Sequence, residues 1–163
     1  MVAVNVDREA SRIGLGLTAA ASLLAALVAA PGSVGLSLVG VPLAVGGVYR
    51  LSRRLLGVGV AALFVGVVLA GVSGLAPGPV VLAMLGVVLT WDLGEHAIGS
   101  AEQLRESADS ERVEVIHAAA SGLVASFFGL GGYIVFLLSA GGQPEIALGL
   151  LLLGAVVALT ALR

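Results

Sequence analysis

The chain contains no cysteine and no lysine, and few of its 163 residues carry a charge. The absence of cysteine excludes a small secreted scaffold held together by disulfides. Charged residues make up 11% of the sequence, less than half of the roughly 25% that soluble domains contain. This shortage disfavours a water-soluble globular enzyme. A net charge of −2 with eight basic residues also disfavours a nucleic-acid-binding protein.

Apolar residues are abundant instead. They make up 59% of the chain, and the mean hydropathy is +1.13. The apolar residues form continuous runs rather than alternating with polar ones, which favours membrane-spanning helices over a β-barrel. We therefore predict an all-α integral membrane bundle that forms a single domain over residues 1–163.

Six apolar runs are separated by proline, glycine or charged residues, and each approaches the roughly 20 residues that a membrane-spanning helix needs. The predicted spans cover about 13–30, 34–49, 55–75, 79–99, 113–140 and 145–162.

The basic residues predict the orientation. All eight are arginines, at positions 8, 12, 50, 53, 54, 105, 112 and 163. With six spans, every one of them falls on the same side of the membrane, and the three opposite loops carry none. The positive-inside rule then places both termini in the cytoplasm. The predicted location is the plasma membrane, crossed six times.

Most of the polar chemistry gathers between Trp91 and Ser121. Helical spacing predicts that helix four continues past the membrane and that helix five begins at Asp109 or Ser110, giving a cytoplasmic helical hairpin over about 92–117. Acids and histidines from its two arms could face each other. The candidate ion, proton or partner site consists of Asp92, Glu95, His96, Glu114 and His117.

The hairpin sequence resembles a known group of proteins. The residues that carry the resemblance are Trp91, Asp92, Gly94, Glu95, His96, Gly99, Glu102, Gln103, Leu104, Glu114, His117 and Ala118. The chain resembles small polytopic membrane proteins of haloarchaea whose function is unknown. The resemblance therefore implies no activity.

Three interpretations of the hairpin remain open. It is a structural element with paired charges, or a proton or cation pathway with Asp92 and Glu95 titrating. The third is a metal site that uses the i, i+3 pair Glu114 and His117, although a second Glu-x-x-His motif is missing.

We expect a non-catalytic subunit or scaffold of a membrane complex. It would have no cofactor and no metal, and its surroundings would be the lipid bilayer and membrane-protein partners or further copies of itself. The alternative is a small proton- or cation-coupled transporter or channel that uses the acidic and histidine residues of the hairpin.

Overall fold

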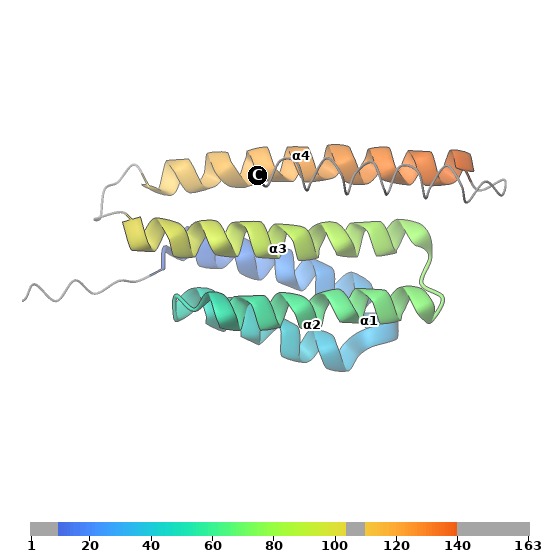
Figure 1. Cartoon of the computed structure of the whole chain (residues 1–163), viewed down its shortest axis with the longest axis horizontal. Coiled ribbons are helices and arrows are strands. Elements are labelled where there is room, and N and C mark those ends of the chain that lie inside the picture. The colour runs from blue at the N-terminus through green and yellow to red at the C-terminus, as the bar shows by residue number, and fades with distance from the viewer. Residues whose placement is uncertain (1–9, 104–109, 140–163) are drawn as a thin grey trace, which may run out of the picture.

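The computed structural model describes residues 10–103 and 110–139, and this part of the chain is built from helices (Figure 1). The predicted all-α fold is confirmed. The four helices are α1 (Arg12–Tyr49), α2 (Arg53–Val72), α3 (Pro77–Gln103) and α4 (Ser110–Ser139).

Four helical stretches are long and apolar enough to cross a membrane. They are Arg12–Pro31, Arg53–Val72, Pro77–Glu102 and Arg112–Leu138. These stretches agree within a few residues with four of the predicted spans, 13–30, 55–75, 79–99 and 113–140. The predicted span 145–162 and the predicted hairpin loop at 104–109 lie outside the described residues.

The predicted helix break between the spans 13–30 and 34–49 needs correction, whereas a membrane crossing by residues 34–49 stays a prediction. The helix does not end at Pro31 but continues through both Pro31 and Pro42 to Tyr49. Proline removes one backbone hydrogen bond and bends a helix, and here the bend does not end the helical conformation. The stretch Val34–Tyr49 is also shorter than the four full-length candidates.

The bend nevertheless reverses the chain. A straight helix of 38 residues would be about 57 Å long, yet Leu15 and Val48, near its two ends, belong to the same hydrophobic cluster. Figure 1 shows α1 running out beside α3 and returning beside α2. The second arm of α1 is thus antiparallel to the first, as the sequence predicted for two neighbouring spans.

Two tight turns connect α1, α2 and α3. After α1, the Ser52 amide donates to the Gly47 carbonyl and the Leu51 amide donates to that of Val48, with Leu51 at a positive φ of 51°. After α2, the Leu75 and Gly74 amides make the same pair of bonds, and Gly74 has a φ of 98°. Both turns are Schellman motifs, which satisfy the last carbonyls of a helix.

Small residues bring α1, α2 and α3 close together. A Cβ atom added to Gly47 would collide with the backbone nitrogen of Leu56, and one added to Gly59 would collide with that of Ala44. Alanines and valines fill the rest of the two cores, with Leu56 and Leu63 fully buried between the helices. Close backbone approach of this kind replaces the hydrophobic drive that lipid cannot provide.

The charged side chains of the described residues all lie at one end of the bundle. This end holds the start of α1, the turn from α1 to α2, the last three turns of α3 and the start of α4 (Figure 1). The turn from α2 to α3, at the other end, carries no charge over residues 73–77. The bundle therefore has one polar end and one apolar end.

Two adjacent glycines test the close packing of α1 against α2. Gly47→Ala would place a methyl group on the Leu56 backbone and should destabilise the fold by about 1–3 kcal/mol, because backbone cannot move aside cheaply. Gly46→Ala meets nothing within 4 Å and should be neutral or stabilising by up to about 1 kcal/mol. Unfolding by SDS titration in mixed micelles measures both, and equal effects of the two variants would contradict this packing.

Candidate functional site

The predicted polar residues of α3 and α4 meet where these two helices face each other. His117 Nε2 lies 3.0 Å from Asp92 Oδ2 and 3.4 Å from Ser121 Oγ. The ring of His96 stacks on that of His117, with ring centres 3.9 Å apart and an angle of 9° between the planes. We call Asp92, His96, His117 and Ser121 the polar cluster.

Helical spacing explains why these four residues meet. Asp92 and His96 are four residues apart on α3, and His117 and Ser121 are four residues apart on α4. Residues at i and i+4 share one face of a helix. Two antiparallel helices can therefore bring both pairs into one contact.

Glu114 is buried one turn before His117 on α4, and its side chain turns toward α1. Only 3% of the residue is exposed, and its Oε2 accepts a hydrogen bond of 2.5 Å from the Ser11 hydroxyl. Ser11 is also the N-cap of α1, because its Oγ accepts from the amides of Ile13 and Gly14. This hydrogen bond connects the start of α4 to the start of α1.

His96 has a buried nitrogen that nothing satisfies among the described residues. Its Nε2 has no hydrogen-bond partner there. An unsatisfied buried polar atom costs about 1–3 kcal/mol and marks a place where water or a ligand group would be favourable. His96 Nε2 could therefore form a hydrogen bond in addition to the contacts that the described residues make.

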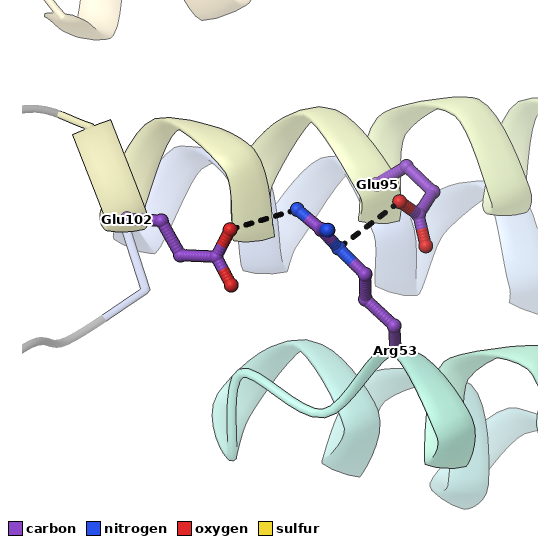
Figure 2. Close-up of polar contacts among 3 residues, drawn as sticks. All are labelled: Arg53, Glu95 and Glu102. Carbon is purple, nitrogen blue, oxygen red and sulfur yellow. Dashed lines mark hydrogen bonds and ion pairs between the residues drawn. The ribbon is translucent and has the colours of Figure 1, made fainter.

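Glu95 does not join the polar cluster. Figure 2 shows Arg53 at the start of α2 reaching toward α3, with its Nε 3.3 Å from Glu95 Oε2 and its Nη2 2.8 Å from Glu102 Oε2. The arginine side chain is 52% exposed, so the two ion pairs contribute little stability. The structure therefore divides the predicted site, because Glu95 and Glu102 turn to α2 while Asp92 and His96 turn to α4.

Sequence reasoning missed Arg53 and Ser11. Arg53 counted as one of the arginines that set the orientation, and Ser11 lies more than 100 residues from its partner Glu114. The Ser11 contact had a local signal, since serine directly before a helix is a common N-cap. The pairing with Glu114 had none.

The polar cluster opens into a groove between α3 and α4. Asp92 and Ser121 line a hollow of about 440 Å³ whose other walls are apolar, among them Val88 and Phe128. The Asp92 side chain is 41% exposed and that of His117 is 33% exposed. Asp92 lies about 22 Å along α3 from Pro77, inside the candidate span Pro77–Glu102. The carboxylate thus directly follows the uncharged first part of this span, residues 77–91, and borders a hollow that is mostly apolar.

The chain matches a known family over both the site and the helical bundle. Residues 8–159 match a family described as a family of unknown function, DUF7519. The chain belongs to this family. No curated protein and no solved structure matches it.

The resemblance found in the sequence and the DUF7519 match agree that the family has no assigned function. Haloarchaeal origin remains a prediction. For this DUF7519 protein, the contacts within the site are therefore the basis of any functional proposal.

The metal interpretation gains no geometric support. Among residues 10–103 and 110–139, no group of three or more histidine, aspartate or glutamate side chains is placed to hold a metal ion. Glu114 and His117 share a face of α4, but Glu114 bonds to Ser11 and His117 bonds to Asp92. The arrangement instead suits the sharing of a proton between a histidine and a carboxylate.

The structure ranks two polar contacts by stability. Ser11→Ala removes the N-cap of α1 and leaves the buried Glu114 carboxylate without its hydroxyl donor, so it should destabilise the fold by about 2–4 kcal/mol. Arg53→Gln removes two exposed ion pairs and should cost about 0–1 kcal/mol. SDS titration of both variants measures the difference, and a larger loss for Arg53→Gln would refute this ranking.

Proposed function

We propose that this DUF7519 protein is a non-catalytic, six-span protein of the plasma membrane with both termini in the cytoplasm, and that it binds and releases protons at Asp92 and His117. The observation that carries this proposal is the 3.0 Å contact between His117 Nε2 and Asp92 Oδ2. Both residues stand within candidate membrane spans.

The cost of these groups supports a functional role. Ionisable side chains inside a membrane are expensive, by about 2.5–3.5 kcal/mol for an aspartate on insertion scales, and they commonly mark ion or proton sites. A scaffold that needed packing alone could use apolar residues at positions 92, 96 and 117. The cluster instead combines a carboxylate, two imidazoles and a hydroxyl.

The chemistry follows from the contacts. When Asp92 is ionised it can only accept, so His117 Nε2 must hold the shared hydrogen. A second proton on His117 gives a charged pair, and loss of that proton restores neutral imidazole. Histidine changes charge near neutral pH, which suits such an exchange. His96 supplies a second imidazole nitrogen with no partner among the described residues.

Polar groups continue from the cluster to the start of α1, at the charged end of the bundle. Glu114 lies one turn along α4 from His117, and its hydrogen bond to Ser11 reaches the start of α1. In the opposite direction the groove is lined by apolar residues such as Leu85 and Val124. Protons would therefore enter from the arginine-rich side, which the proposed orientation places in the cytoplasm.

A titration of the two histidines tests the proposal. His96 and His117 are the only histidines of the chain, so ¹⁵N-histidine labelling gives a spectrum with two assignable side chains. In lipid nanodiscs we expect the His117 side chain to gain and lose a proton as the pH is changed. Asp92→Asn should alter that transition, because it removes the carboxylate oxygen that lies 3.0 Å from Nε2.

Glu95→Gln is the matched control, because it removes an acid of the same helix that pairs with Arg53 rather than His117. It should leave the His117 transition in place. A His117 signal that does not titrate, or one that responds equally to Glu95→Gln and Asp92→Asn, would overturn the proposal.

The orientation can be tested with single cysteines, because the chain has none of its own. Ser73→Cys lies in the turn at the apolar end, and Arg54→Cys lies at the polar end. We expect a membrane-impermeant maleimide to label the first in intact cells and the second only after permeabilisation. The reverse pattern would place the termini outside.

A membrane scaffold is the second candidate. The observation that favours it is that, after Glu114, no residue of the candidate span of α4 is buried within the described fold. Phe127 and Phe128 are 75% and 71% exposed on this helix. A scaffold should assemble normally with Asp92→Asn, whereas the proton-binding role should be lost.

A further inference from the structure

The groove between α3 and α4 continues well beyond the polar cluster. The hollow that begins at Asp92 and Ser121 shares Leu85, Val88, Phe128 and Gly129 with a second hollow of about 520 Å³. The second hollow extends along the same two helices to Pro77 and Tyr133. Within the described part of the chain, the two hollows form one groove that is polar at one end and apolar along its length.

The groove exists because α4 packs loosely on α3. Along α1 and α2, glycines let the backbones touch, whereas Gly129 of α4 faces the flexible end of Leu85. Gly132 also lines the groove, and it has no side chain that could fill the space there. The result is a hollow along the two helices whose walls are mostly apolar.

The charge at the polar end favours a cation. Asp92 is the acidic residue that borders the groove, and its side chain is 41% exposed. Arg53 is bonded to Glu95 and Glu102 instead. A positively charged group at Asp92 would complement the site, whereas an anionic or acidic headgroup would be repelled.

We propose that this groove binds a lipophilic amine, with its ammonium group at Asp92 and Ser121 and its hydrocarbon chain along Leu85, Val88 and Phe128. This inference rests on the proposed function, because the proton and the ammonium group use the same carboxylate. An alkylammonium group donates hydrogen bonds that Asp92 Oδ and Ser121 Oγ can accept. The apolar walls exclude water and strengthen this contact.

Photo-labelling in zwitterionic nanodiscs tests the proposal. The probe is a dodecylamine carrying a diazirine in mid-chain, and the matched probe is the same chain with a neutral hydroxyl head. We expect the amine to label groove residues around Val88 and Phe128, mapped by mass spectrometry, and excess dodecylamine to suppress this labelling. The neutral probe should label these positions at least about ten-fold less.

Three variants sharpen the result. Asp92→Asn should reduce amine labelling at least about ten-fold, and Glu95→Gln should leave it unchanged. Ala125→Phe should reduce labelling by filling the groove without altering any charge. Gel filtration of each variant checks that it remains folded.

Several outcomes would overturn the inference. Equal labelling by both probes would show ordinary lipid in the groove. Amine labelling that survives Asp92→Asn would show that the carboxylate does not hold the head. A photo-leucine at position 124 that cross-links to residues 145–162, without amine labelling, would show that another part of the chain occupies the groove.

The titration of His117 separates the two proposals. If His117 titrates in dependence on Asp92 while the amine does not label the groove, the amine proposal fails alone. If His117 does not titrate, the proposed proton function fails as well.

Discussion

Three polar contacts join α4 to α1 and α3 at the polar end of the described bundle. Ser11 bonds to Glu114, Asp92 bonds to His117, and His96 stacks on His117. Away from this end, two hollows lie between α3 and α4, and Gly129 packs against the side chain of Leu85. The attachment of α4 at its polar end therefore depends on a few ionisable groups.

The other three helices follow a different rule. Gly47 and Gly59 bring the returning arm of α1 and helix α2 into backbone contact, and Ala25 and Gly86 do the same for the outgoing arm and α3. Such packing has no titratable element and should not respond to pH. The molecule thus combines a closely packed three-helix unit with a fourth helix that contacts it through ionisable groups. If His117 binds a proton as proposed, these contacts would change while the packing of the other three helices stays intact.

Hydropathy and charge spacing predicted much of this arrangement. The long apolar runs ending in charge or glycine predicted, within a few residues, four helical stretches that are long and apolar enough to cross a membrane, because this property depends on composition more than on detailed packing. The i, i+4 spacing of Asp92 with His96 and of His117 with Ser121 predicted two polar faces, and the antiparallel hairpin brought them together. The direction of Glu95 could not be predicted, because positions 92, 95 and 96 are close on a helical wheel and the neighbour α2 decides between them.

The other features could not be predicted, because they depend on a bend at proline and on contacts between residues far apart in the sequence. Pro31 and Gly32 are typical of the end of a helix. In the structure, however, α1 bends there and remains helical as far as Tyr49. Ser11 and Glu114 are separated by 103 positions, and no local pattern connects them. The groove depends on the relative placement of α3 and α4, since Leu85 and Gly129 must lie opposite each other. Helical periodicity describes each helix separately and contains no information about that placement.

The most direct test of this account is a solid-state NMR correlation in lipid bilayers between His117 Nε2 and the Asp92 carboxyl carbon. The account predicts a strong cross-peak, because the nitrogen lies 3.0 Å from Asp92 Oδ2. It also predicts that the peak survives in Glu95→Gln protein. If both side chains are ordered but no correlation links them, the polar cluster does not exist as described and the proton-binding account is wrong.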